Sequence, residues 1–516
     1  MSRTWASLIG LLTLALCSAA HAETRRYAVV VGHNGSEDPG LAPLRYADDD
    51  AIRYWELLRL TADEATLLVD PDEETARLYR SVPRRPPTRA AVLEALATTR
   101  ERMAADRARG DTPMLYFVYS GHGNYDQEGR GYTWLEGGRF TTRDLYDQVL
   151  APSEGSPVVL IVDACNAALL VNSRGPGSTG DRRRAAPSTM NLEHYPNVGV
   201  ILSSSSVSEV HEWGRYLAGV FSHEVRSGLL GPADLDGDGA VTFPELAAFV
   251  ASANDRVANP TLRLAPYIRP PLDRPSLPVV DLRTMRFPAR LHIGAGEPTR
   301  GWLVDGNLVR QADFHTDGAH AFEIGLTRAD EEWVVVTGAV ERRVPAGTRG
   351  TVALANLPRE GAALAGTRGT TDSYFERTLF QEPYGATFAN GFLIDTYPGS
   401  LVVERLVPVP WYENPLAWSL VGGGLAMAGG GLGVHLWALD AQERANAATF
   451  AADAAAANQD IETGRLASGI LYGAGAAAFA SGVLVFLLDD RMEVERYVPP
   501  IRVMVGPEGV SIEGSL

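Results

Sequence analysis

The chain is poor in cysteine. It has 516 residues but only two cysteines, Cys17 and Cys165. Residues 1–22 contain a basic residue, an apolar run and a small-residue end, which is typical of a secretory signal peptide cleaved before Glu23. Cleavage leaves one thiol in the mature chain, which excludes an intrachain disulfide and favours a catalytic role for Cys165. The alternatives are an uncleaved anchor and lipid attachment at Cys17, although Leu16 stands where a small residue is expected.

Positive charge is also scarce. The 46 basic residues, all of them arginine, face 63 aspartate and glutamate residues, which gives a formal net charge of −17. We therefore expect no nucleic-acid partner. The histidines at His211 and His223 lack metal-ligand spacing, so we interpret them as surface or packing residues, and we expect no organic cofactor.

Two apolar runs, residues 114–119 and 157–162, each end in a reactive residue. The first is followed by Ser120-Gly121-His122-Gly123 and the second by Asp163-Ala164-Cys165-Asn166. Runs of about six β-branched and aromatic residues closed by turn residues are typical of buried strands in a parallel sheet. If the two strands are neighbours, His122 and Cys165 lie at their carboxyl ends, where open α/β sheets perform chemistry.

This arrangement predicts a cysteine hydrolase. The imidazole of His122 can take the thiol proton of Cys165, and the thiolate is the nucleophile. The N–H of Gly123 can join that of Cys165 in binding an oxyanion, because glycine permits close backbone approach. The alternative is a core cysteine beside a strand-end histidine, but both residues at neighbouring strand ends favour function.

The two motifs resemble the His–Cys dyad of the caspase and metacaspase family of cysteine peptidases, in its bacterial branch, over roughly residues 25–255. His122 precedes Cys165 by 43 positions, and the family spacing is about 50. Asp163, two positions before the cysteine, matches metacaspases. The Gln-Ala-Cys signature of true caspases is absent, and Asn166-Ala167-Ala168 stands where metacaspases have His-Ser-Gly.

The resemblance implies a substrate pocket and a self-cleavage site. In the family an Asp-Ala pair, here Asp50-Ala51, supplies an acidic group to the pocket, and Asp163 supplies another. These carboxylates would select arginine or lysine before the cleaved bond. The loop at residues 172–189, which contains Arg182-Arg183-Arg184, lies where caspase relatives are self-cleaved, so we expect cleavage there.

Other strand and helix signals complete an α/β domain over residues 23–257. Strands are expected at residues 26–32, 65–70 and 198–202, and helices at residues 89–108 and 142–150. Their alternation predicts a caspase-like, mostly parallel sheet flanked by helices.

The segment at residues 234–245 fits the calcium loop of an EF-hand. Hard oxygen ligands at this spacing suit Ca²⁺ in a structural or activating role, and the expected ligands are Asp234, Asp236, Asp238, Ala240 through its carbonyl, and Glu245. Gly231-Pro232 prevents an entering helix, so only the following helix, residues 244–253, is expected. The alternative is an acidic helix-entry loop without metal.

The C-terminal half has a different pattern. A Pro- and Arg-rich linker is expected at residues 258–278, and short apolar runs separated by Gly, Asp and Pro predict a β-rich domain at residues 279–410. Apolar stretches at residues 416–439 and 467–488 are long enough to cross a bilayer. They predict a transmembrane hairpin with a helical link at residues 440–466 and a tail at residues 489–516. The alternative is a buried helical hairpin rich in glycine and alanine.

Together these features predict an exported cysteine endopeptidase of the cell envelope. The membrane anchors it through the C-terminal helices, the peptidase domain lies outside the cytoplasm, and the substrate is a protein or peptide. The acidic link at residues 440–466 does not follow the positive-inside rule, but the export signal is the stronger constraint. Alternatives are a non-catalytic caspase-fold scaffold or Ca²⁺-responsive binding protein, and a hydrolase acting on a non-peptide ester or amide.

Overall fold

The structure is a computed structural model. It describes residues 23–153, 155–171, 192–203, 212–259, 262–264, 266–361, 370–396, 403–408, 412, 414–488, 492–497, 502–506 and 509–513. The chain divides into two compact units, Met1–Val402 with Val498–Leu516, and Val403–Tyr497. The predicted signal peptide and the predicted self-cleavage loop lie outside the described residues.

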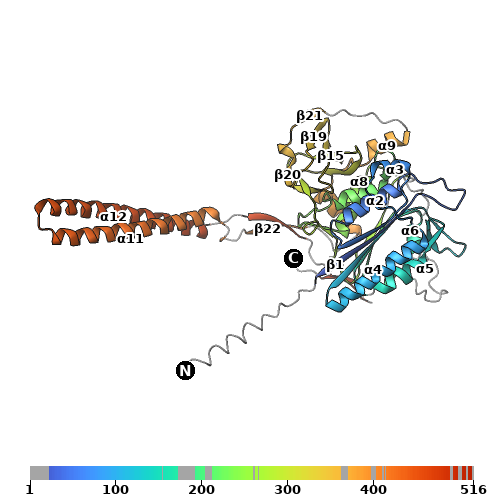
Figure 1. Ribbon diagram of the computed structural model, residues 1–516, viewed down its shortest axis with the longest axis horizontal. Helices are drawn as coiled ribbons and strands as arrows, with labels where there is room; N and C mark the ends of the chain where they lie inside the picture. The colour runs from blue at the N-terminus through green and yellow to red at the C-terminus, as the bar shows by residue number, and fades with distance from the viewer. Residues whose placement is uncertain are drawn as a thin grey trace, which may run out of the picture. The chain divides into compact units, whose positions relative to one another are not determined.

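A six-stranded sheet forms the centre of the first unit (Figure 1). Its strands lie in the order β12-β8-β7-β3-β1-β2, with bounds Tyr267–Arg269, Val198–Leu202, Val158–Asp163, Thr112–Gly121, Thr24–His33 and Glu64–Leu68. Neighbours are parallel except β12, which runs antiparallel to β8. All six residues of β7 are buried, as expected for an apolar strand covered on both faces. The predicted α/β class with a mostly parallel sheet is confirmed.

Helices cover both faces of this sheet. Side chains of β3 alternate between two separate cores, with Tyr116 and Val118 in one and Phe117 and Tyr119 in the other. The first core holds the helices on one face, α2 (Ala47–Leu58), α7 (Val220–Leu229) and α8 (Phe243–Asn254). The second holds α4 (Arg89–Arg109), α5 (Thr142–Leu145) and α6 (Ala167–Val171), which lie together below the sheet in Figure 1. Helix α3 is the short segment Glu73–Leu78.

Short elements are inserted around this frame. A small antiparallel sheet, β4-β5-β6, follows β3 directly and was not predicted; its strands are Gly123–Tyr125, Gly131–Leu135 and Gly138–Thr141. A π-helical turn, Tyr146–Leu150, continues α5 over the rest of the helix expected at residues 142–150. Before α7, β9 (Glu212–Trp213) pairs with β10 (Ala218–Gly219).

The β-rich segment forms two sheets. One has the order β17-β14-β20 and the other β16-β15-β18-β19-β21. Their bounds, from β14 to β21, are Ala289–Ile293, Thr299–Val304, Arg310–Thr316, Phe322–Leu326, Trp333–Thr337, Val340–Val344, Gly350–Ala353 and Glu360–Gly361. Two helices follow, α9 (Thr370–Thr378) and α10 (Ala386–Thr396). Buried and partly exposed residues alternate along β14, as expected for a strand with one face packed on the core and the other toward solvent.

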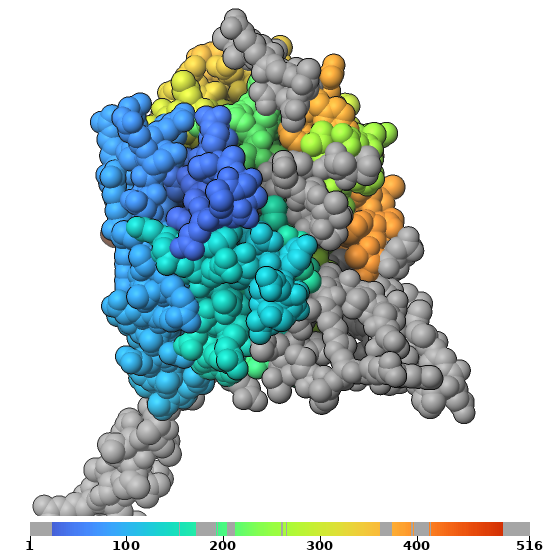
Figure 2. All heavy atoms as spheres, turned by 90° about the vertical axis from the view of Figure 1, so that its right-hand side faces the viewer, coloured from blue at the N-terminus to red at the C-terminus, as the bar shows by residue number. Residues whose placement is uncertain are grey.

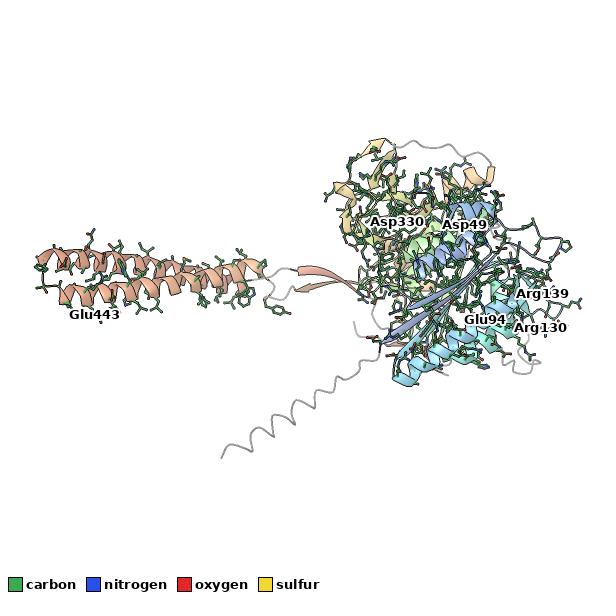
Figure 3. The ribbon with its side chains drawn as sticks, viewed as in Figure 1. Asp49, Glu94, Arg130, Arg139, Asp330 and Glu443 are labelled. Carbon is green, nitrogen blue, oxygen red and sulfur yellow. The ribbon has the colours of Figure 1, made fainter. Side chains whose placement is uncertain are left out.

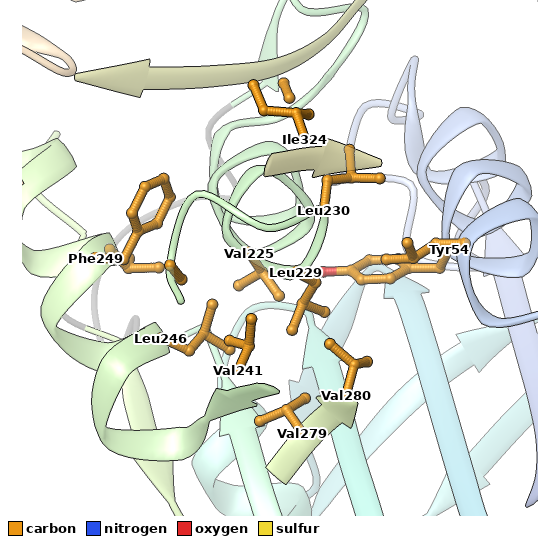
Figure 4. Packing of buried hydrophobic residues seen from close by; sticks show 14 of the residues in the cluster. Tyr54, Val225, Leu229, Leu230, Val241, Leu246, Phe249, Val279, Val280 and Ile324 are labelled. Atoms are coloured by element: carbon orange, nitrogen blue, oxygen red, sulfur yellow. The ribbon is translucent and has the colours of Figure 1, made fainter. Parts of the chain in front are cut away.

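The β-rich segment shares its core with the parallel sheet. Leu229, Leu230 and Phe249 belong to the same buried cluster as Ile324, and Figure 4 shows Leu230 beside Ile324. A Cβ built on Gly231 would lie 1.9 Å from the carbonyl oxygen of Glu323, so the two backbones touch there. In the space-filling view blue N-terminal segments adjoin yellow atoms of the β-rich segment (Figure 2).

The stretch expected as a linker, residues 258–278, contributes to the sheet. Ile268 of β12 lies opposite Ile201 of β8, at the sheet edge. β13 (Pro278–Asp281) then pairs antiparallel with β11 (Ala240–Thr242), next to the acidic loop. The many prolines of this stretch suit an edge strand and its flanking turns, because an edge strand needs only half of its backbone N–H groups in the ladder.

The second unit contains two long helices joined by a short turn. α11 spans Pro415–Ala447 and α12 spans Ala451–Leu487, so the helices extend through the predicted link. Both are long and apolar enough to cross a membrane. β22 (Val403–Pro408) pairs antiparallel with β23 (Met492–Tyr497) at the base of the hairpin. β24 (Arg502–Gly506) pairs with β25 (Gly509–Glu513) in the C-terminal tail, which is grouped with the first unit.

Small residues line the contact between α11 and α12. The buried positions of α11 are Ala417, Gly424, Gly431, Ala438 and Ala441, and those of α12 are Ala457, Gly464, Ser468, Gly475 and Gly482. Large apolar side chains such as Leu425 and Phe479 are exposed instead. Charged side chains of the hairpin gather toward its turn, where Figure 3 labels Glu443; they are Asp440, Glu443, Arg444, Asp453, Asp460, Glu462 and Arg465.

Candidate active site

The histidine and cysteine motifs follow two strands that pair directly. β3 and β7 are parallel, and their last paired residues are Ser120 and Asp163. His122 and Cys165 each lie two residues beyond that pair. The equal offset places both residues at the same edge of the sheet, beyond the carboxyl ends of its strands.

The histidine segment touches the cysteine turn at Gly123. A Cβ built on Gly123 would lie 2.2 Å from the carbonyl oxygen of Cys165, so no side chain fits there. Gly123 faces Thr133 across β4 and β5, and the Trp134 N–H donates to the His122 carbonyl over 3.0 Å beside this pair. That bond marks Gly123–Thr133 as a non-hydrogen-bonded pair, so the ladder with β5 does not use the Gly123 N–H.

The His122 side chain is buried and oriented by a backbone carbonyl. Its Nε2 lies 3.0 Å from the oxygen of Ala42. A carbonyl oxygen can only accept, so this contact assigns the proton to Nε2 and leaves Nδ1 as the basic nitrogen. Burial lowers the pKa of His122, although the Ala42 contact and the charge of Asp38 act in the opposite direction. The imidazole is therefore neutral at neutral pH and able to accept a proton.

The Cys165 turn is fixed from the neighbouring strand. Cys165 is half-buried and lies between β7 and α6. The N–H of Ala164 donates to the Ser203 hydroxyl over 3.0 Å, and that hydroxyl donates to the Ala164 carbonyl, also over 3.0 Å. Asn166 then takes a left-handed conformation with φ of 56°, one that asparagine tolerates better than most residues. These contacts fix the backbone on both sides of Cys165.

The two predicted pocket carboxylates lie side by side. Asp50 on α2 and Asp163 at the end of β7 are 1% and 2% exposed. A Cβ built on Gly219 would lie 2.9 Å from Oδ2 of Asp163 and 3.1 Å from Oδ2 of Asp50, so both carboxylates converge on this glycine. The Gly219 N–H donates to Asp50 over 2.7 Å, and the Ser222 hydroxyl donates to Asp163 over 2.6 Å.

An arginine already accompanies these carboxylates. Nη2 of Arg226 on α7 lies 3.2 Å from Oδ1 of Asp50, and both side chains are 2% exposed. Burial raises the pKa of Asp50, and the Arg226 guanidinium opposes that rise. Burial also raises the pKa of Asp163, where the strongest opposing influence is the hydrogen bond from Ser222. The preference for basic substrates stays a prediction, and one of the two carboxylates already has a cation as its partner.

The other two aspartates of the Asp48-Asp49-Asp50 run have separate partners. Asp48 accepts from the Asn34 amide over 2.8 Å. Asp49, on α2 in Figure 3, accepts from the Thr75 hydroxyl over 2.7 Å and pairs with Arg53 at 3.4 Å. All three aspartates are buried, so they are not a solvated first turn of a helix.

The acidic loop before α8 brings three of its predicted ligands together. Asp234, Asp236 and Glu245 each offer a carboxylate oxygen within 4.8 Å of the others. Burial, with repulsion from Asp236, raises the pKa of Asp234 to about 7 and also raises the pKa of Glu245. Gly239 has a φ of 82°, which supplies the sharp turn at the sixth loop position.

The remaining loop features fit half of an EF-hand. Asp238 lies outside this group of three and accepts the Ala240 N–H over 2.7 Å. Glu245 accepts from Leu235 N–H over 3.0 Å and caps α8 through Thr242. α7 ends at Leu229, before the loop begins, and α8 starts directly after β11. Two buried carboxylates and a half-buried one that converge are a donor set that a hard divalent cation satisfies, so the residues fit Ca²⁺.

Sequence reasoning missed several contributors to the site, and three of them illustrate why. The Ala42 carbonyl acts through the main chain, which leaves no side-chain signature. Arg226 meets Asp50 only through the tertiary fold, from 176 positions away. The β4–β5–β6 sheet begins immediately after His122, and the turn residues Gly129 and Gly137 near its strands were its available signal.

No protein-family model matches the chain, and no curated protein matches it. Similar solved structures include protein GSU0716 from Geobacter sulfurreducens, at 14% identity over 48% of this chain and 93% of that chain, with a TM-score of 0.29. Caspase-1 from Spodoptera frugiperda matches at 12% identity over 48% and 87%, with a TM-score of 0.30. A pro-Sf-caspase-1 structure matches at 13% identity over 49% and 92%, with a TM-score of 0.29.

Proposed function

We propose that the protein is a cysteine endopeptidase in which His122 and Cys165 form the catalytic dyad. The observation that carries this proposal is the parallel register of β3 and β7, which gives both residues the same offset beyond one strand pair. The contact of Gly123 with the Cys165 carbonyl supports it, because it holds the two segments together.

In the proposed reaction, Nδ1 of His122 accepts the Cys165 thiol proton and the thiolate attacks the substrate carbonyl carbon. The N–H groups of Gly123 and Cys165 bind the oxyanion of the tetrahedral intermediate. As the peptide bond breaks, His122 returns the proton to the leaving amine and a thioester remains. A water molecule, deprotonated by His122, then hydrolyses the thioester and restores the thiol.

The proposed substrates carry a basic residue before the cleaved bond. Asp163 and Asp50 supply the negative charge for this preference. The chain contains no lysine, so any self-cleavage after a basic residue follows an arginine. The candidates are Arg182, Arg183 and Arg184.

The proposed calcium role is structural or activating. It is supported by the convergence of Asp234, Asp236 and Glu245. The loop leads into α8, and Asn254 of α8 donates to Glu224 of α7 over 2.6 Å. A cation that orders the loop would therefore stabilise the helix that carries Ser222 and Arg226.

The proposed location is the cell envelope, with the peptidase part exported and the α11–α12 hairpin in the membrane. Support for the hairpin comes from its exposed large apolar side chains and from charges gathered toward its turn. At about 1.5 Å per residue, each helix exceeds the roughly 30 Å of a bilayer core, so the charged end extends beyond it.

Hydrolysis of fluorogenic peptides tests the proposed activity. The full chain in detergent should cleave peptides with Arg before the fluorophore, and Cys165→Ala and His122→Ala should lose that cleavage. His292→Gln, on β14 of the β-rich segment, is the matched control and should retain it. Cleavage that survives Cys165→Ala rules out the proposed nucleophile, and no cleavage by the native chain favours a scaffold.

A further inference from the structure

Arg226 pairs with one of the two buried carboxylates that are proposed to bind a basic substrate side chain. Arg226 lies 3.2 Å from Asp50, and the two side chains are 2% exposed. Its guanidinium carbon also lies 5.8 Å from the centre of the Tyr54 ring, so α2 contacts it through an aromatic face as well as a carboxylate. A cation held in this way competes with any second cation for the same carboxylate.

The two carboxylates differ in their partners. Oδ1 of Asp50 faces Arg226, and its Oδ2 accepts the Gly219 N–H. Oδ2 of Asp163 accepts the Ser222 hydroxyl. Among the described residues, no arginine lies within ion-pair distance of Asp163. Asp163 is also only two positions from Cys165, whereas Asp50 reaches the pair from α2.

We propose that Arg226 is a specificity-determining residue that neutralises Asp50 and leaves Asp163 as the carboxylate that meets a basic substrate side chain. This inference rests on the proposed peptidase activity and refines its substrate pocket. Both carboxylates are buried, so a substrate side chain enters only when Arg226 moves aside. The strength of the preference then depends on competition between Arg226 and the substrate.

Counting charges gives opposite expectations for single substitutions. Asp50, Asp163 and Arg226 together carry one net negative charge when all are ionised. Arg226→Met removes the competitor and leaves two negative charges, so it strengthens the preference for basic substrates. Asp50→Asn leaves Arg226 with Asp163 as its nearest acidic partner, so it weakens that preference. In the double variant, Asp163 carries the one remaining negative charge and Arg226 no longer competes for it.

The test compares the native chain with these three variants in detergent. The measured quantity is kcat/KM for a peptide with Arg before the fluorophore, divided by kcat/KM for the matching Met peptide. We expect this ratio to rise about tenfold or more in Arg226→Met and to fall by a similar factor in Asp50→Asn, since one charge contact of this kind amounts to at least a factor of ten. Asp50→Asn/Arg226→Met should return to the native ratio or exceed it.

The same set of variants also provides the control for loss of folding. Arg226→Met leaves Asp50 buried without its cation, which destabilises a fold strongly, whereas replacing both members of a buried pair is often tolerated. The double variant therefore keeps the test informative if Arg226→Met does not fold. Cleavage of the Met peptide measures, in each folded variant, how much catalysis is retained.

Three outcomes overturn the inference. The first is an unchanged ratio in folded Arg226→Met, and the second is a double variant whose ratio stays as low as that of Asp50→Asn. The third is a native chain that cleaves neither peptide. That third result removes the proposed function itself, whereas the first two leave it standing, so the two failures are distinguishable.

Discussion

The Nε2 atom of His122 lies 3.0 Å from the carbonyl oxygen of Ala42, a residue 80 positions earlier in the chain. This contact determines which ring nitrogen carries the proton. It leaves Nδ1 as the basic nitrogen, which is the atom that the proposed mechanism uses, and no third side chain is needed to orient the ring. In the proposed dyad, His122 is thus oriented by the main chain, in contrast to triads that use a carboxylate for the same purpose.

The activity should fall as the pH is lowered, with a midpoint below 6.5. Burial holds the pKa of His122 below its ordinary value of 6.5, and only the neutral imidazole accepts the thiol proton. The pH dependence of kcat/KM for an Arg peptide measures this midpoint. A lower limb centred above 6.5 would show that His122 is not the base in this environment.

Gly123→Ala should reduce kcat about a hundredfold, the scale expected when a reacting group is displaced by about 1 Å. The added Cβ would lie 2.2 Å from the Cys165 carbonyl oxygen, so the cysteine turn must shift. Gly294→Ala is the matched control, because nothing lies within 4 Å of a Cβ at that position. Equal kcat values in both variants would mean that the Gly123 contact does not position the nucleophile.

Much of this site could be predicted from local sequence. The apolar runs before His122 and Cys165 required buried strands, and the turn residues after them required strand ends. The spacing of the acidic residues from Asp234 to Glu245 is likewise a local pattern, and it was sufficient to predict a metal-ligand loop. The pairing of β3 with β7 is a feature of the tertiary structure, and the register that aligns His122 with Cys165 depends on that pairing.

The remainder depends on long-range contacts that no local pattern encodes. Arg226 looks in sequence like any helical arginine, and only the packing of α7 against α2 turns it toward Asp50. The stretch before β13 reads as a linker because of its prolines, yet Tyr267–Arg269 completes the sheet edge beside β8. The length and apolar composition of the C-terminal helices were sufficient to predict a hairpin, because that signal is local.

Calcium should raise the thermal unfolding temperature of the full chain, and chelation should lower it again. Binding at a hundred times the dissociation constant stabilises the folded state by about 2.7 kcal/mol. Asp236→Asn removes one of the three converging carboxylates and should abolish the calcium-dependent shift. Asp273→Asn is the exposed control and should keep it. A shift of equal size in both variants would place calcium elsewhere.

Gly424→Leu should separate α11 from α12, whereas Gly423→Leu should not. A Cβ on Gly424 would lie 2.7 Å from the Gly475 carbonyl oxygen, but nothing lies within 4 Å of one on Gly423. Cysteines placed at Ala438 and Gly464, in a chain lacking both native cysteines, report the contact through disulfide formation in membranes. We expect severalfold slower cross-linking with Gly424→Leu. Equal rates in the two variants would contradict the small-residue interface.

The most direct test of the central claim is covalent capture of Cys165 by a peptidyl acyloxymethyl ketone with arginine next to the ketone. Intact-mass spectrometry of the full chain measures the rate of thioether formation. We predict rapid modification at Cys165 alone, at least about a hundredfold slower in His122→Ala and unchanged in His292→Gln. Modification at the same rate in His122→Ala and the native chain, or none in either, would contradict a His122–Cys165 dyad.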